Sequence, residues 1–271
     1  MTSDEFQAGS PALAPLALHR RGAGRPLLLV HGFQGAAADW VHVFPEPPGA
    51  GSSSQPGDEP RELIEVDLPG HGRSSADADG RFRFRRAAER LAATLEGAEL
   101  AAVDAIGLSG GALTLLLLAQ RHPRLLRRVV AVSATPYFPP QARDFMAAVD
   151  PEEQSEADWQ AMRARHPGGD AQIRRLWQWS RDLRHSRGDV ELGHVELRRI
   201  ATPFLLVHGD RDPLYPLPLA LQLYEGLADA RLWVVPEGGH GPIFGSQAPP
   251  FRRAALEFLG AAGSQQKEAR G

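Results

Sequence analysis

The chain contains no cysteine, and its only lysine is Lys267. Without cysteine there are neither disulfide bonds nor thiolate metal sites. An excess of charge is also lacking, because 30 basic and 33 acidic side chains leave a formal net charge of −3, which indicates neither a nucleic-acid nor a membrane-surface partner. No apolar run is long enough for a membrane span, and the polar start MTSDEFQAGS has no hydrophobic signal segment. We therefore predict a cytoplasmic protein that needs no metal or cofactor.

The 271 residues are enough for one large α/β domain with a sizeable core. Short apolar runs, typical of strands buried on both faces, occur at 27–30, 63–66, 103–108, 129–132, 204–207 and 232–235, with a further edge strand expected at 16–19. Apolar residues at helical spacing predict helices within 84–95, 220–227 and 251–259. Because strands and helices alternate, we predict a mostly parallel, twisted sheet flanked by helices.

Two segments interrupt this alternation. Residues 45–60 are rich in Pro, Gly and Ser, which predicts a mobile loop. Residues 136–199 lie between two late strands yet have helical periodicity, and about sixty residues are too many for a simple crossover in a compact domain. We interpret that segment as a helical insertion, with a long crossover as the alternative. The predicted organisation is a core of residues 14–135 and 200–261, a helical cap at 136–199, and flexible tails at 1–13 and 262–271.

A Gly-Leu-Ser-Gly-Gly sequence at 107–111 lies between a strand-like run and a helix-like run. A serine in such a strand-to-helix turn adopts an unfavourable backbone conformation, and glycines two residues to either side let strand and helix pack without Cβ clashes. Its hydroxyl projects near the positive end of the helix. Ser109 is therefore a candidate nucleophile, and a structural turn serine is the alternative.

A nucleophilic serine needs a base, and the base needs an orienting carboxylate, in the chain order Ser, acid, His. Asp212 follows the apolar run 204–207, and His240 follows the run 232–235 between glycines. Each side chain would then lie at the carboxyl end of a strand, where open α/β sheets bind their ligands. Asp210 is the rival for the acid, since it lies in the same turn.

Taken together, these motifs resemble those of the serine α/β-hydrolases, including capped esterases and C–C hydrolases. His31-Gly32-Phe33 matches the family's H-G-aromatic turn, and residues 67–74 (DLPGHGRS) match its D-x-x-G-x-G-x-S loop. The resemblance spans about residues 27 to 258 and implies the α/β-hydrolase fold with a cap between two late strands. It also implies a Ser109–Asp212–His240 triad and an oxyanion hole made by the backbone N–H groups of Phe33 and Gly110.

The substrate pocket is harder to predict. We expect it to be lined by Phe33, Leu108, Phe138, Trp159 and Trp177, although each cap aromatic has packing of the cap as its alternative role. Phe145, Met146 and Trp179 could likewise either line the pocket or pack the cap onto the core. Among other polar groups, His31, His71 and His208 are expected to be structural, His122 to cap a helix, and the cap arginines 163, 165, 174 and 175 to form a solvated face or a carboxylate clamp.

The predicted activity is cofactor-independent hydrolysis of a carboxylic ester, or a related carbonyl compound, with an apolar acyl or aryl group, through an acyl-enzyme on Ser109. Two enzymatic alternatives use the same triad: a C–C bond hydrolase of ring-cleavage diketones, and a thioesterase or acyltransferase. A non-enzymatic alternative is a ligand sensor or scaffold with the hydrolase fold. The sequence leaves the natural substrate and the oligomeric state open.

Overall fold

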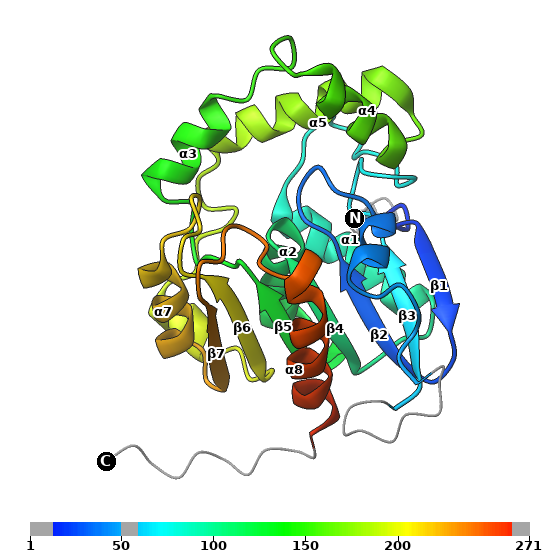
Figure 1. The fold of residues 1–271 in the computed structure, drawn as a ribbon, viewed down its shortest axis with the longest axis vertical. Coiled ribbons are helices and arrows are strands. Elements are labelled where there is room, and N and C mark those ends of the chain that lie inside the picture. The colour runs from blue at the N-terminus through cyan, green and yellow to red at the C-terminus, as the bar shows by residue number, and fades with distance from the viewer. Residues whose placement is uncertain (1–12, 50–58, 262–271) are drawn as a thin grey trace, which may run out of the picture.

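The computed structural model describes residues 13–49 and 59–261. The predicted tails, apart from residue 13, and most of the predicted loop 45–60 lie outside the described residues. Seven strands in the described part form one sheet in the order β1-β3-β2-β4-β5-β6-β7, seen in Figure 1. The strands are β1 Leu18–Gly22, β2 Arg25–Val30, β3 Arg61–Val66, β4 Val103–Leu108, β5 Leu126–Val132, β6 Phe204–Gly209 and β7 Ala230–Val235.

The sheet is parallel except at one edge. Strand β1 pairs antiparallel with β3, and the remaining neighbours run parallel. The edge strand predicted at 16–19 therefore exists but is displaced toward the C-terminus. All parallel strands end at the same edge of the sheet, where the loops that follow them converge.

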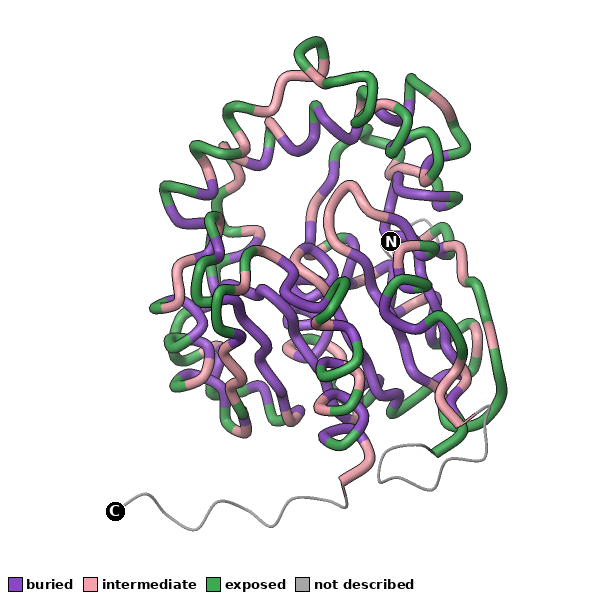
Figure 2. Tube along the Cα trace, viewed as in Figure 1, coloured by how far each residue is buried: buried purple, intermediate pink, exposed green. Residues whose placement is uncertain are grey.

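Helices cover both faces of the sheet. The helices of the core are α1 Phe84–Gly97, α2 Gly110–Arg121, α7 Leu217–Gly226 and α8 Ala248–Gly260. Apolar side chains of α1, α2 and α7 belong to one buried cluster with alternate strand residues such as Leu28 and Val30. The intervening Leu27 and Leu29 face a second cluster with α8 and the 3₁₀ helix Ala37–His42. This period of two explains why the central strands read as continuous apolar runs, and Figure 2 shows most of their length buried.

The segment between β5 and β6 contains four α-helices, α3 Pro140–Ala147, α4 Glu156–Arg165, α5 Gly169–Asp182 and α6 His194–Arg198, and the 3₁₀ helix Leu183–His185. Figure 1 shows α3, α4 and α5 as an arch over the carboxyl ends of the strands. Helix α5 buries Ile173, Leu176 and Trp177, as their shared face predicted. The assignment of 136–199 as a separate cap remains a prediction about domain boundaries, but its helices lie where a cap would cover the site.

Across the described residues, no helix combines the length and apolar character required to cross a membrane.

Helix α2 approaches strands β2 and β4 so closely that the glycines in the turn are required. A Cβ added to Gly111 would lie 2.1 Å from the carbonyl oxygen of Val30, and one added to Gly107 would lie 2.7 Å from the backbone nitrogen of Ala112. Real Cβ atoms do not make such contacts with backbone atoms, so a side chain here would force the helix off the sheet.

We predict that Gly111→Ala lowers the free energy of unfolding by about 3 kcal/mol, because overpacking against backbone is not relieved by a rotamer change. Urea denaturation would measure the difference. Gly97→Ala is the matched control, since a Cβ there meets nothing within 4 Å and should leave stability equal or slightly higher. Equal stability of the two variants would contradict the argument for a tight turn.

Candidate active site

Ser109 lies in the sharp turn between β4 and α2. Its φ of 49° and ψ of −112° fall outside the backbone regions that non-glycine residues ordinarily occupy. Its N–H donates to the Val132 carbonyl oxygen at 2.8 Å, which holds the turn against the end of β5. The strain predicted from the motif is therefore present, and it projects the hydroxyl above the sheet.

The structure brings together the three side chains predicted as the triad. His240 follows β7, and its Nε2 accepts a hydrogen bond from the Ser109 hydroxyl, with 2.8 Å between Oγ and Nε2. Its Nδ1–H donates to Asp212 Oδ2, also at 2.8 Å. With the hydrogen of Nδ1 directed at Asp212, Nε2 is the ring nitrogen that faces the serine and can accept its proton.

The rival acid, Asp210, lies in the same turn but is exposed. Its backbone N–H donates to the Val235 carbonyl oxygen, whereas it is Asp212 whose carboxylate receives the imidazole proton. The geometry thus favours Asp212 as the orienting acid.

Asp212 is 7% exposed and is held as a carboxylate by several donors. Burial alone would raise the pKa of Asp212, but hydrogen bonds from His240 and from the backbone N–H groups of Tyr215 and Leu214 lower it below its ordinary value. The backbone donors reach Oδ1 at 2.8 Å from Leu214 and 3.0 Å from Tyr215. The carboxylate is therefore charged and fixed in orientation at neutral pH.

Two residues around His240 were not predicted from the sequence. Ser133, itself at a positive φ of 51°, accepts a hydrogen bond on Oγ from the Gly241 N–H at 3.0 Å and so fixes the loop that carries His240. The Tyr215 ring packs edge-on against the imidazole, with 5.3 Å between centroids. The sequence offered one clue to the role of Tyr215, which is that this aromatic residue follows the predicted acid Asp212 by three positions.

The backbone near Ser109 provides two candidate oxyanion donors. Gly110 is the first residue of α2, so its N–H has no partner within the helix. A Cβ on Gly110 would lie 3.0 Å from the backbone nitrogen of Phe33, which places the two predicted donors side by side. Phe33 itself lies in a turn closed by a 2.9 Å hydrogen bond from the Gly35 N–H to the Gly32 carbonyl oxygen.

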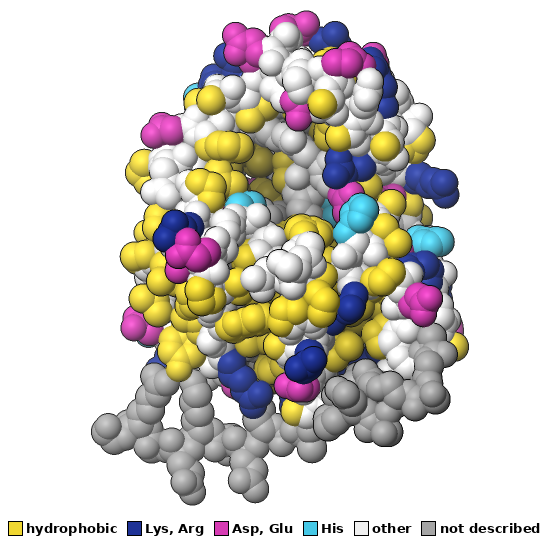
Figure 3. Space-filling model, in the orientation of Figure 1, with side chains coloured by type: hydrophobic (Ala, Val, Ile, Leu, Met, Phe, Trp, Pro, Cys, Tyr) yellow, Lys and Arg dark blue, Asp and Glu magenta, His cyan; other side chains and the backbone are white. Residues whose placement is uncertain are grey.

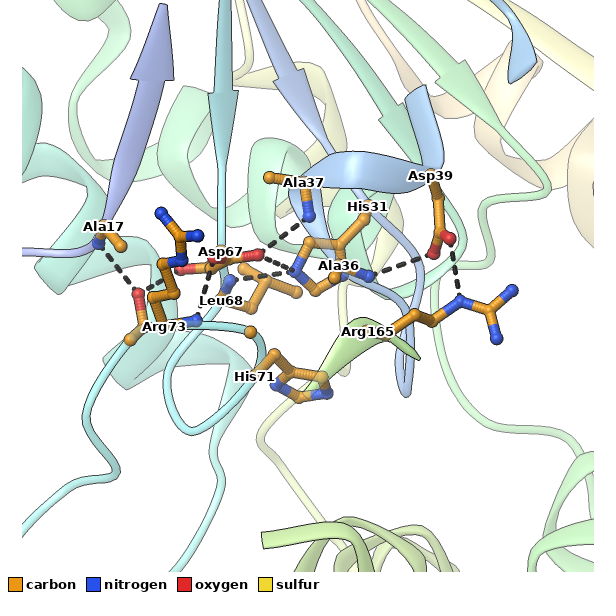
Figure 4. A network of polar contacts seen from close by, with 12 residues as sticks. Ala17, His31, Ala36, Ala37, Asp39, Asp67, Leu68, His71, Arg73 and Arg165 are labelled. Atoms are coloured by element: carbon orange, nitrogen blue, oxygen red, sulfur yellow. Dashed lines mark hydrogen bonds and ion pairs between the residues drawn. The ribbon is translucent and has the colours of Figure 1, made fainter. Parts of the chain in front are cut away.

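The D-x-x-G-x-G-x-S loop supports this turn from behind, as Figure 4 shows. Asp67 accepts hydrogen bonds from the backbone N–H groups of Ala37 and Arg73 at 2.8 and 2.9 Å. His31 Nε2 accepts from the Leu68 N–H at 3.0 Å. These buried groups therefore hold two loops together, in keeping with the structural role expected for His31.

A divided cleft lies between the arch of helices and the sheet, and Figure 3 shows the hollow beneath the arch. One chamber of about 310 Å³ contains Ser109 and His240 and has mainly apolar walls, among them Phe84, Phe138, Ala142, Phe145, Met146, Val149, Leu183, Leu214 and Tyr215. A neighbouring chamber of about 770 Å³ is more polar, with Asp39, His42, Gln154, Asp158 and Arg165 in its wall. Phe33, Leu108 and Phe244 belong to both walls.

Four of the five predicted pocket residues line this cleft. Phe33, Leu108 and Phe138 face the smaller chamber, and Trp177 the larger one. Trp159 lines neither chamber, so its prediction needs correction.

Trp159 instead packs edge-on against Trp177, with 4.5 Å between ring centroids. The guanidinium groups of Arg163 and Arg174 lie over its ring. Residue type alone did not reveal this, because the position of Trp159 is decided by its packing against Trp177 of α5.

His208, His71 and His122, which the sequence predicted to be structural, have ordinary hydrogen-bond or ion-pair partners. His208 Nε2 donates to the Tyr215 carbonyl oxygen at 2.7 Å, and His71 Nδ1 donates to the Pro69 carbonyl oxygen at 3.0 Å. His122 is the residue that ends α2 and pairs with Glu89. Within the described ranges, no group of three or more histidine, aspartate or glutamate side chains is arranged to hold a metal ion.

Comparison with known proteins agrees with this architecture. The model of the alpha/beta hydrolase fold family matches residues 25–158, and that of the TAP-like proteins matches residues 177–268. The chain belongs to the α/β-hydrolase fold superfamily. It is 29% identical over 266 residues to the 2-hydroxymuconate semialdehyde hydrolase of Pseudomonas putida, covering 89% of each chain. It is 26% identical over 179 residues to the human serine hydrolase BPHL, covering 65% of this chain and 61% of the relative.

Solved structures of two kinds of enzyme share the fold. An esterase from Exiguobacterium antarcticum superposes with a TM-score of 0.70 at 19% identity, covering 91% of this chain and 96% of the other. The meta-cleavage product hydrolase CumD of Pseudomonas fluorescens gives a TM-score of 0.67 at 18% identity, covering 90% and 93%. The protein is thus an α/β serine hydrolase, whose relatives include both C–C hydrolases and esterases.

The lowered pKa of Asp212 predicts how acid affects stability. The pKa of Asp212 is lower in the folded protein than in the unfolded chain, so the ionised carboxylate stabilises the fold at neutral pH. This stabilisation is lost as the pH falls through the folded-state pKa. The difference in Tm between wild type and Asp212→Asn should therefore be largest near pH 7 and shrink toward about pH 3.

Thermal unfolding across this pH series would measure the effect. Asp210→Asn is the control, and its Tm should stay close to that of wild type throughout because the Asp210 side chain is exposed. A constant difference for Asp212→Asn would argue against a stabilising carboxylate.

Proposed function

We propose that the protein hydrolyses carboxylic esters, or closely related carbonyl compounds, through an acyl-enzyme on Ser109. The observation that carries the proposal is the pair of 2.8 Å contacts linking Ser109 Oγ, His240 and Asp212 at the floor of a chamber with apolar walls. This geometry supplies a nucleophile, a base and an orienting acid without a cofactor.

In the proposed reaction Ser109 Oγ attacks the carbonyl carbon while His240 Nε2 takes the hydroxyl proton. The negative charge that develops on the carbonyl oxygen is stabilised by the N–H groups of Phe33 and Gly110, and Asp212 stabilises the imidazolium. His240 then protonates the leaving oxygen as its bond to the carbonyl carbon breaks. Water, deprotonated by the same imidazole, attacks the acyl-enzyme and releases the acid and the free serine.

The walls of the chamber that holds Ser109 support an apolar acyl or aryl group as the substrate's reacting part. Phe84, Phe138 and Leu183 contribute buried side chains, and transfer of apolar substrate surface into such a chamber is favourable. Its volume of about 310 Å³ lies at the small end of ligand sites, which favours short acyl chains or a single ring.

A C–C hydrolase of ring-cleavage diketones is the second candidate. It is supported by the 2-hydroxymuconate semialdehyde hydrolase of Pseudomonas putida, which matches this chain over 89% of both lengths. Its Ser-His-Asp constellation would be the same, and the polar chamber beside the nucleophile would offer room for the charged part of such a substrate.

We predict that Ser109→Ala lowers ester turnover by about 10⁴-fold or more, because the nucleophile and its base act as a unit. Hydrolysis of short-chain p-nitrophenyl esters and labelling by a fluorophosphonate probe would measure the loss. The Tm of the variant should stay close to that of wild type, and near-normal turnover would overturn the assignment of Ser109.

The acid can be tested by the same assay. Asp212→Asn keeps the size of the side chain but presents the wrong hydrogen-bond partner to the imidazole, a change that costs about 10⁴ in turnover in a serine protease. Asp210→Asn should retain most activity. If Asp210→Asn were the inactive variant, the roles of the two residues would be reversed.

A substrate panel distinguishes the candidate reactions. Esters of increasing acyl length, an acyl thioester and a ring-cleavage diketone should be compared by kcat/KM with purified wild-type protein. Highest values for short apolar esters would support the first proposal, and highest values for the diketone would support the second. Absence of turnover and of probe labelling would indicate a sensor or scaffold.

A further inference from the structure

Gln34 immediately follows the proposed oxyanion donor Phe33 and has a strained backbone. Its φ of 66° lies in the left-handed region that non-glycine residues seldom occupy. Such a conformation persists only when the surrounding contacts hold it. The peptide group after Gln34 carries the Gly35 N–H, which closes the turn around Phe33 by donating to the Gly32 carbonyl oxygen at 2.9 Å. The contacts of Gln34 therefore affect the geometry of the turn that carries the Phe33 N–H.

Both backbone groups of Gln34 are bound by histidines from distant segments. The Gln34 N–H donates to His71 Nε2 at 3.1 Å, and the Gln34 carbonyl oxygen accepts from His166 Nε2 at 3.0 Å. Its side-chain amide donates to the Ser180 hydroxyl. His166 and Ser180 belong to the helical arch, so two of these three contacts come from the segment that covers the cleft.

His166 bridges two loops of the core. It follows α4, is 1% exposed, and accepts a hydrogen bond on Nδ1 from the Gly72 N–H at 3.0 Å. The ring thus accepts a hydrogen bond from the Gly72 N–H on Nδ1 and donates one from Nε2 to the Gln34 carbonyl oxygen, which requires the neutral form with hydrogen on Nε2.

The surroundings of His166 favour that neutral form. Burial lowers the pKa of His166, the Gln34 carbonyl oxygen opposes that shift, and His31 and Arg165 nearby lower it further while Asp67 raises it. The net direction is downward, so both hydrogen bonds are available at neutral pH.

We infer that His166 is a positioning residue that couples docking of the helical arch to the geometry of the oxyanion hole. With His166 in place, Gln34 is held at its positive φ and the Phe33 N–H is held beside that of Gly110. Without this contact Gln34 would relax toward negative φ, and the Gln34–Gly35 peptide group would rotate. The Gly35 N–H would then leave the Gly32 carbonyl oxygen, and the turn that carries the Phe33 N–H would loosen. The inference rests on the proposed function in one respect, since it takes the Phe33 N–H as an oxyanion donor.

Cap packing in general would not produce this effect, and the chain offers a control. Trp179 Nε1 donates to the Gly80 carbonyl oxygen at 2.8 Å, which is another, partly buried hydrogen bond between the arch and the core. It does not involve the loop of Phe33. Trp179→Phe removes that hydrogen bond and keeps an aromatic ring, so it tests loss of a cap contact alone.

The test compares His166→Ala, His166→Gln, His166→Asn and Trp179→Phe in the full chain. An amide nitrogen of Gln lies near the position of Nε2 and can still donate to Gln34, whereas the shorter Asn reaches only the position of Nδ1. We expect kcat for a p-nitrophenyl ester to fall about tenfold to a hundredfold in the Ala and Asn variants. KM should change little, and the Gln and Trp179→Phe variants should keep most of kcat.

Hydrogen exchange gives a readout that does not depend on turnover. Peptides covering residues 31–37 should exchange faster in His166→Ala than in wild type or in Trp179→Phe. Equal exchange in these three proteins, or an equal loss of kcat in His166→Ala and Trp179→Phe, would overturn the inference. If His166→Ala failed to fold, the difference between the Gln and Asn variants would decide in the same way.

The two proposals can fail separately. Wild-type protein without ester turnover would overturn the proposed function, while faster exchange at 31–37 in His166→Ala would still support coupling between the arch and this loop. Normal ester turnover in wild type and in all His166 variants would leave the proposed function standing and overturn the coupling.

Discussion

The close approach of helix α2 to the end of strand β2 is the constraint on which the site depends. The Cα of Gly111 lies so near the Val30 carbonyl oxygen that no side chain fits between them. This contact fixes the start of α2 and thereby the strained turn of Ser109. The same contact sets the Gly110 N–H beside the loop of Phe33, so one packing requirement positions both the nucleophile and a candidate oxyanion donor.

The parallel sheet then brings distant residues to this point. Asp212 and His240 each follow a strand whose carboxyl end lies at the same edge as that of β4. Backbone N–H groups bind the Asp212 carboxylate in the resting site. Its negative charge is therefore in place before the imidazole becomes positively charged in the proposed reaction. The site is therefore preorganised by elements that also form the core, and little reorganisation is required during the proposed reaction.

Much of this arrangement could be predicted from the sequence, for identifiable physical reasons. Buried strands appear as apolar runs, and the turn at Ser109 requires glycines that are visible in the sequence, so the fold and the triad geometry followed from short patterns. The side-chain environment of the helical arch could not be predicted in this way. Trp159 and Trp177 are both large and apolar, and only tertiary packing places Trp177 in the wall of the cleft and Trp159 against Trp177 outside that wall.

The contacts of Gln34 escaped sequence analysis for a different reason. Nothing in the local sequence indicates its positive φ, because the conformation is imposed by His71 and His166, which lie 37 and 132 positions away. Tyr215 is similar, since its place beside His240 depends on how the loop after β6 folds back. Sequence patterns identify residues that chemistry requires, whereas residues that hold the backbone in strained forms emerge only from the three-dimensional structure.

The partition of the cleft by Phe33, Leu108 and Phe244 has a consequence for evolution of the enzyme. These side chains belong to the walls of both chambers, so a change in any of them alters the shape of both chambers at once. The space in one chamber therefore cannot be altered at these positions without altering the space in the other. Residues that line a single chamber, such as Met146 or Gln154, are free to diversify independently, and new specificities would be expected to arise there first.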